Sequence, residues 1–96
     1  MNVPQMDKDK GMFFIFESEG TYPFWMKNTL IPLDIIWIDN RNKIVYIAEN
    51  AQPCPASTLI CPSISPLGNA KYVLEINGGL CQALGIKAGD EVSIKN

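Results

Sequence analysis

Two carboxylic acids stand inside predicted β-strands whose other residues are almost all apolar. Asp34 lies in Leu33–Asp39 and Glu75 lies in Ala70–Asn77. Because an unpaired carboxylate is costly to bury, each acid needs either a partner or a shifted pKa. The two acids could therefore act as a general acid and base. The alternative is a structural ion pair or hydrogen-bond network, in which Lys27 pairs with one acid and anchors the crossing of the strands.

A polar triplet, Lys27-Asn28-Thr29, leads into the first of these strands. Its ammonium, amide and hydroxyl groups could bind an anionic or carbonyl group of a ligand. They could instead satisfy backbone groups of a difficult turn. Trp25, beside this irregular turn, is a candidate for an exposed stacking surface, and packing in the core is its alternative. The predicted ligand site consists of Trp25, Lys27, Asn28, Thr29, Asp34 and Glu75.

The chain has three cysteines, two of which lie close together in the sequence. Cys54 and Cys61 flank the hexapeptide PASTLI, and each is followed by proline. A disulfide between them would contribute about 2–3 kcal/mol in the chain-entropy description. Free structural thiols are one alternative, and a metal or redox site is another, although the chain has no CxxC motif. Cys81 is predicted to be a buried free thiol.

The composition excludes several classes of function. The chain has no histidine, so Ser-His and Cys-His catalytic pairs are absent, as is the commonest zinc ligand. Its eight Lys and Arg residues are scattered and the net charge is −2, which disfavours nucleic-acid binding. No apolar run approaches the ~20 residues that span a bilayer, and no signal segment opens the chain. We therefore expect no nucleic-acid partner, no transmembrane segment, no cofactor and no metal.

The hydrophobic pattern predicts a chain built mainly of β-strands. These strands are expected at Met12–Glu17, Tyr22–Met26, Leu33–Asp39, Lys43–Glu49, Ala70–Asn77 and Glu91–Ile94. Met12–Glu17 has apolar residues at successive positions, which point to opposite faces of a strand, and this predicts a strand buried on both faces. Leu33–Asp39 and Lys43–Glu49 are joined by Asn- and Asp-rich turn residues and are predicted to form a β-hairpin. Trp37 alternates with Ile35 and is expected in the core.

The remaining segments are predicted to be loops and one helix within a single domain of residues 1–96. Residues 1–10 are polar and are expected to form a lead-in loop. Residues 50–69 contain four prolines and two cysteines and are predicted to form a long ordered loop. A short helix is expected at Leu80–Leu84, closed by Gly85 in the left-handed conformation. Its inward face is predicted to consist of Leu80, Ala83 and Leu84.

The order of these segments resembles the DUF192 family. The resemblance rests on GMFFIF, FWMKNTLIPLDIIWID, the proline–cysteine loop, AKYVLEINGG and LGIKAGDEV, and it spans Gly11–Ile94. It implies a small, mainly β, barrel-like domain with no assigned biochemical role. Family members normally carry a further strand ahead of GMFF; either this sequence is trimmed at that point or the strand is absent, and its absence would leave a sheet edge open for dimerisation. Many members are exported or membrane-anchored, which implies an extracytoplasmic location, and the two-cysteine loop favours the same.

We therefore expect one all-β domain, a small barrel-like or curled sheet of about five or six strands with one short C-terminal helix. The first functional hypothesis is a non-enzymatic binding or accessory module whose polar-aromatic cleft holds a small polar ligand or peptide. The second is a hydrolase-like or lyase-like enzyme with Asp34 or Glu75 as general base and Lys27 as electrostatic stabiliser. The third is a structural domain of a cell-envelope assembly. A monomer, or a dimer through the open sheet edge, is the expected state.

Overall fold

The computed structural model describes residues 11–26, 29–54, 61 and 63–93, which form a main antiparallel sheet and a small ribbon. The strand order of the main sheet is β1–β6–β3–β4. Its strands are β1 (Gly11–Gly20), β3 (Leu33–Ile38), β4 (Ile44–Ala51) and β6 (Ala70–Asn77). The ribbon pairs β2 (Phe24–Trp25) with β5 (Ser63–Ile64), and α1 (Leu80–Leu84) is the helix of the described residues. This arrangement confirms the predicted mainly-β domain with one short helix.

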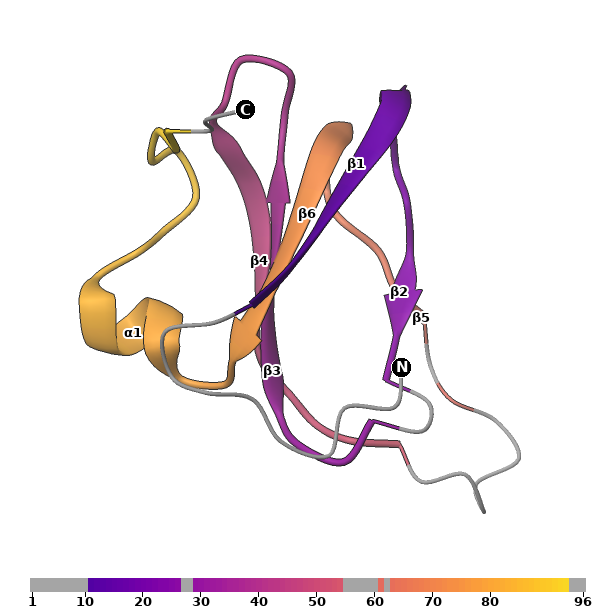
Figure 1. The fold of residues 1–96 in the computed structure, drawn as a ribbon, viewed down its shortest axis with the longest axis vertical. Helices are drawn as coiled ribbons and strands as arrows, with labels where there is room; N and C mark the ends of the chain where they lie inside the picture. The colour runs from indigo at the N-terminus through magenta and orange to yellow at the C-terminus, as the bar shows by residue number, and fades with distance from the viewer. Residues whose placement is uncertain (1–10, 27–28, 55–60, 62, 94–96) are drawn as a thin grey trace.

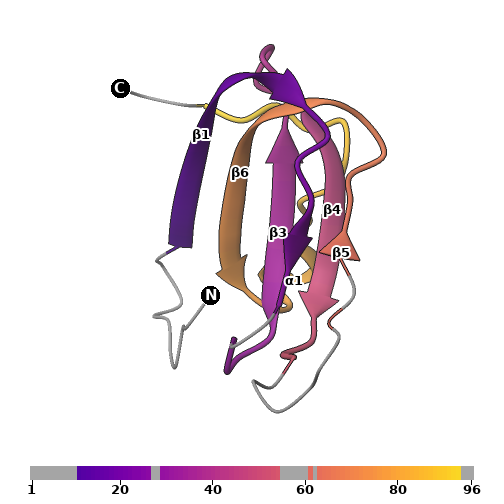
Figure 2. The ribbon, with the colours of Figure 1, turned by 90° about the vertical axis from the view of Figure 1, so that its right-hand side faces the viewer.

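The main sheet separates two layers of covering structure (Figure 1). The β2–β5 ribbon lies over one face, called here the front face, and α1 with the segment after it lies over the other, the back face. A view turned by 90° shows the same order, with β2 and β5 nearest the viewer and α1 behind the sheet (Figure 2). Within the described residues, no helix has the length and apolar character needed to cross a bilayer.

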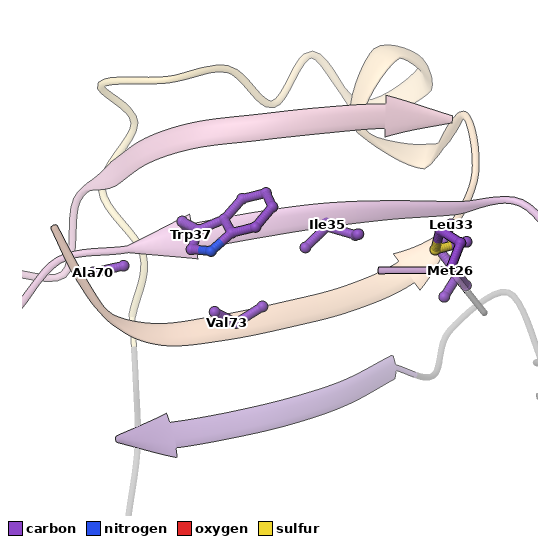
Figure 3. Close-up of a cluster of buried hydrophobic side chains, with 6 residues drawn as sticks. All are labelled: Met26, Leu33, Ile35, Trp37, Ala70 and Val73. Atoms are coloured by element: carbon purple, nitrogen blue, oxygen red, sulfur yellow. The ribbon is translucent and has the colours of Figure 1, made fainter. Parts of the chain in front are cut away.

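Strand β3 runs through the middle of the sheet and is buried along its whole length. Because side chains alternate along a strand, its residues supply the cores of both faces. The front core consists of Met26, Leu33, Ile35, Trp37, Ala70 and Val73 (Figure 3). The back core consists of Ile36, Ile38, Ile44 and Cys81. The predicted burial of Trp37 is confirmed, and its indole Nε1 donates to the carbonyl oxygen of Tyr22 at 2.9 Å.

The β3–β4 hairpin is also confirmed, because Ile36 pairs with Ile47 and Trp37 pairs with Tyr46. The predicted loop at residues 50–69 is partly wrong. Strand β4 continues to Ala51, and the short strand β5 lies inside the predicted loop. Asn50 lies where the register between β3 and β4 shifts, as at a β-bulge: its φ is 52° and its N–H donates to the Asp34 side chain.

Strand β1 differs from the prediction of a strand buried on both faces. On the front face, Met12, Phe14 and Phe16 are half-buried, and Phe14 and Phe16 pack against the front core. On the back face, Phe13 and Ile15 are exposed, and the exposed fraction of Ile15 is 64%. In the described part of the chain β1 pairs only with β6 and is therefore an edge strand. The ring of Phe13 stacks on Tyr72 with centroids 5.6 Å apart, so Phe13 extends the aromatic contacts of the back face to this edge.

The C-terminal region requires two corrections. The helix α1 buries Cys81, whereas Leu84 is 68% exposed, so the predicted inward face of the helix is wrong. Gly85 does close the helix in the left-handed conformation at φ 71°, and the N–H of Ile86 donates to the carbonyl of Cys81 at 2.8 Å. Of the predicted strand Glu91–Ile94, the described residues 91–93 form only a β-bridge between Lys43 and Glu91, and Ile94 lies outside the described residues. The predicted lead-in loop at residues 1–10 lies outside the described residues.

Candidate functional site

The two buried acids lie on opposite faces of the main sheet. In the register of β3 with β6, Ile35 is opposite Glu75 and Asp34 is opposite Ile76. Directly opposed residues point to the same face, so Glu75 shares the front face with Ile35 while Asp34 faces the back. The hypothesis that Asp34 and Glu75 form one acid–base pair is therefore corrected. The sheet itself separates the two carboxyl groups.

Asp34 is fully buried and serves as an acceptor for three backbone N–H groups. Its Oδ1 accepts from Asn50 at 2.7 Å and from Gly79 at 3.0 Å, and its Oδ2 accepts from Cys81 at 2.8 Å. Burial alone would raise the pKa of Asp34, but these N–H groups and the Cys81 thiol hold it below its ordinary value. Asp34 thus ties the end of β4 to the start of α1 by a hydrogen-bond network, one of the structural alternatives that the sequence left open.

Gly79 gives this network its geometry. It precedes α1 at φ 91°, a conformation that favours glycine, and as the N-cap residue it has no side chain of its own to cap the helix. The Asp34 carboxylate, which comes from the neighbouring layer, instead satisfies two N–H groups at the start of α1, those of Gly79 and Cys81. Gly79 therefore positions backbone donors toward Asp34 directly after the end of β6.

Glu75 is buried without a partner in the described part of the chain. It is 0% exposed, and neither of its carboxyl oxygens has a hydrogen-bond partner among the described residues. Its opposed neighbours are Met12 on β1 and Ile35 on β3, and both are apolar. Burial raises the pKa of Glu75 from 4.5 to about 7. The carboxyl group is thus held near the point of half-ionisation at neutral pH.

Met26, the residue after β2, connects two other residues to the same core. The carbonyl oxygen of Met26 accepts the N–H of Thr29 at 3.1 Å and the N–H of Cys54 at 3.0 Å. Met26 lies beside Leu33 at one end of β3 (Figure 3). Thr29 is fully buried. Thr29 and Cys54 are therefore both joined to Met26 and, through it, to the front core.

The structure brings together fewer of the predicted ligand-site residues than the sequence suggested. Thr29 and Glu75 are both fully buried, whereas Trp25 is 50% exposed. Trp25 points away from the sheet because Phe24, its neighbour in β2, packs against the front core. Lys27 and Asn28 lie outside the described residues. Met12 and Met26 were missed as possible site residues, because their apolar side chains carry no sequence signal that distinguishes them from ordinary core.

Cys54 and Cys61 form a disulfide, as the first of the three alternatives predicted. Cys54 packs against the front core and Cys61 is buried. Cys81 is a buried free thiol, as predicted. Burial, together with the hydrogen bond to Asp34 and its charge, raises the pKa of Cys81 to about 12. Among the described residues, no three His, Cys, Asp or Glu side chains gather closely enough to hold a metal ion.

Replacing both Cys54 and Cys61 by serine is expected to lower the free energy of unfolding by about 2–3 kcal/mol, because the cross-link restricts the unfolded chain. Urea unfolding of the double variant and of the wild type measures this difference. The wild type in dithiothreitol is the matched control and should unfold at the same urea concentration as the double variant. Equal stability of the wild type with and without the reductant would contradict the prediction.

These features define a class of protein: a small antiparallel β-domain with a buried acid on each face of its central strands. The family model of DUF192, described as Uncharacterized ACR, matches residues 1–94. The chain belongs to the DUF192 family. The predicted resemblance is therefore confirmed, and the match includes residues ahead of Gly11. The expected lack of an upstream strand concerns residues outside the described part of the chain and stays a prediction.

Two solved structures are similar to this chain. A protein of unknown function from Novosphingobium aromaticivorans is 39% identical with a TM-score of 0.83, and the match covers 94% of this chain. The chain spans 61% of the length of that protein. A protein from Sinorhizobium meliloti, described as a candidate transcription regulator, is 36% identical with a TM-score of 0.79, and the match covers 95% of this chain and 67% of that one. No curated protein matches the chain.

Proposed function

We propose that this domain is a non-enzymatic binding module that holds a small polar ligand or peptide at its front face. The observation that carries the proposal is the Glu75 carboxyl group, which is buried among apolar side chains with no hydrogen-bond partner in the described residues. A buried carboxyl group without a partner is destabilising. A ligand that supplies the missing partner would recover this free energy on binding. The buried acid is therefore a reason to expect a ligand.

The chemistry of Glu75 selects the kind of ligand group. Once ionised, a carboxylate only accepts hydrogen bonds, so the ligand must donate them. Ammonium and guanidinium groups would form charge-assisted bonds, which are stronger than neutral ones and stronger still in apolar surroundings. Thr29 and Trp25 remain candidates for contacts to the rest of the ligand. Lys27 and Asn28, which follow Met26 in the sequence, are kept as proposed site residues.

Carbon-13 NMR of the Glu side-chain carboxyl groups tests the proposal with methylguanidinium as the probe and acetate as the probe of opposite charge. At pH 8, methylguanidinium should move the Glu75 signal and lower the pKa of Glu75, whereas acetate should do neither. Glu75→Gln should weaken binding of methylguanidinium at least tenfold. The matched control is Glu17→Gln, which changes an exposed acid of β1 and should leave the affinity unchanged.

The opposite result would assign Glu75 a structural role. If methylguanidinium leaves the Glu75 signal in place, and Lys27→Ala raises the pKa of Glu75 by a unit or more, then the chain supplies its own cationic partner. Such a pair would fix the fold rather than bind a ligand. The domain would then suit the third hypothesis, a structural domain of a cell-envelope assembly.

An acid–base enzyme is the second candidate function, and the raised pKa of Glu75 favours it. A carboxyl group with a pKa of about 7 is suited to act as a general base at neutral pH. Asp34 is less suited, because three backbone N–H groups stabilise its ionised form. A hydrolase-like or lyase-like activity should rise through an inflection near pH 7 and be lost in Glu75→Gln. Activity that survives Glu75→Gln would exclude this role.

The proposal extends to location and partners. The Cys54–Cys61 disulfide supports an extracytoplasmic location, because such bonds persist mainly in oxidising compartments. The scattered cationic residues and net charge of −2 favour a small ligand or peptide over nucleic acid, although one similar protein is described as a candidate transcription regulator. A dimer through the edge of β1 remains the alternative to a monomer.

A further inference from the structure

A hollow lies on the back face, away from Glu75. It is a cavity of about 310 Å³ between the main sheet and the segment that follows α1. Its lining residues are Ile36, Ile38, Ile44, Leu74, Ile86, Asp90, Glu91, Val92 and Ser93. Small-molecule pockets occupy roughly 300–1,000 Å³, so this cavity is large enough for a small molecule and too small for a folded partner.

Backbone hydrogen bonds fix the outer wall of the cavity. At one end of the wall, the N–H of Ile86 is held by the carbonyl of Cys81 in the close of α1. At the other end, Ile44 donates to the carbonyl of Asp90 at 2.9 Å and accepts from the N–H of Gly89 at 2.8 Å, while Val92 donates to the carbonyl of Asn42 at 2.6 Å. The segment is therefore tied to α1 at one end and beside β4 at the other, and the cavity is already formed without a ligand.

The residues that line the cavity are mostly apolar, and the charged ones are acidic. Most of the lining residues are aliphatic, and the charged residues among them are Asp90 and Glu91. The Oδ2 of Asp90 accepts the N–H of Lys87 at 2.9 Å. Arg41 does not line this cavity but belongs to an adjoining polar hollow of about 420 Å³. Among the described residues, the cavity thus combines apolar walls with negative charge.

From this complementarity, we propose that the back cavity binds a small amphiphile, an aliphatic body with a cationic amine head. The aliphatic body would displace water from the isoleucine, leucine and valine side chains of the wall. The amine would lie close to the carboxylates of Asp90 and Glu91. An anionic head directed to Arg41 is the competing arrangement. This site is separate from the proposed ligand site at Glu75, because the sheet lies between the two.

Methyl NMR of the wild type tests the proposal with three probes that share a chain length: n-octylammonium, octanol and octanoate. At pH 7, n-octylammonium should shift the methyl signals of Ile36, Ile44 and Val92 and bind at least fivefold more tightly than octanoate. The affinity of octanol should lie between the affinities of n-octylammonium and octanoate. The comparison of probes requires no variant, so it does not depend on the folding of a mutant.

Four variants locate the site. Val92→Trp, which fills the cavity, should weaken n-octylammonium binding at least tenfold, whereas Leu67→Trp at an exposed position should not. Glu91→Gln should reduce the preference for n-octylammonium over octanoate about threefold. Glu17→Gln, which changes an exposed acid of β1, should leave binding unchanged. The proposal fails if no probe shifts the three methyl signals, if octanoate binds as tightly as n-octylammonium, or if Val92→Trp leaves binding unchanged.

Discussion

Replacing Asp34 by alanine is expected to lower the free energy of unfolding by about 4 kcal/mol. The change leaves three backbone N–H groups without their acceptor, those of Asn50, Gly79 and Cys81. An unsatisfied buried donor costs about 1–3 kcal/mol. Domains of this kind have roughly 5–15 kcal/mol of stability in total, so the loss is a large share. Urea unfolding followed by circular dichroism measures it.

The chain offers a matched control at Asp39. Its Oδ1 also accepts two backbone N–H groups, those of Arg41 at 2.9 Å and Lys43 at 3.0 Å, but in an exposed turn. Water replaces the lost acceptor there, so Asp39→Ala should cost about 1 kcal/mol or less. Asp34→Asn retains one acceptor oxygen, so its cost in the free energy of unfolding should lie between the costs of the two alanine variants. A cost for Asp34→Ala no larger than that for Asp39→Ala would show that the buried network contributes little.

Replacing Glu75 by an apolar residue is expected to raise the free energy of unfolding at alkaline pH, whereas Asp34→Ala lowers it. Glu75→Met should raise the free energy of unfolding by about 2 kcal/mol at pH 8, because it replaces a buried carboxylate without a described partner by an apolar side chain of similar size. At pH 4.5 the gain should be much smaller, because the carboxyl group is then largely protonated in the folded protein. Urea unfolding of the variant and the wild type at both pH values measures the two effects.

The pH dependence of the wild type follows from the same carboxyl group. The pKa of Glu75 is raised from 4.5 to about 7 on folding, so between these values the folded protein binds more protons than the unfolded chain. Stability therefore falls as pH rises through this window. At about 1.4 kcal/mol for each pKa unit, the loss is about 3 kcal/mol by pH 8. Glu75→Gln, which cannot titrate, should remove this loss, and a wild type that is more stable at pH 8 than at pH 5 would contradict the prediction.

Asp34 has the opposite effect on the pH dependence of stability, and it does so at lower pH. Because folding lowers its pKa, Asp34 contributes stability that is present above its ordinary value of 3.8 and lost as pH falls below it. The two acids together predict maximum stability near pH 4–5. This maximum lies below the neutral range in which small domains are usually most stable.

Much of the fold was predictable from local patterns. The alternation of Trp37 with Ile35 predicted that Trp37 lies in the core, and the structure confirms it. Gly85 marked the end of α1, and the spacing of Cys54 and Cys61 pointed to the disulfide. Each of these signals lies within a few residues of its structural consequence.

The candidate site was less predictable, because it depends on how distant strands align. The positions of Asp34 and Glu75 in their own strands were correct, but a shift of one residue in register moves a side chain to the other face. No local feature distinguishes a register with Asp34 opposite Glu75 from the observed one with Ile35 opposite Glu75. The same limit explains β1, whose apolar residues on both faces predicted burial although Ile15 is exposed at the sheet edge.

The most direct test of the account is a carbon-13 NMR titration of the Glu75 side-chain carboxyl group in the wild type. The account predicts an inflection near pH 7 that does not move in Asp34→Asn, because the sheet separates the two acids, and does not rise in Lys27→Ala. An inflection at or below pH 4.5 would contradict it. Glu75 would then be ionised and paired within the chain, and the proposed binding site on the front face would lose its basis.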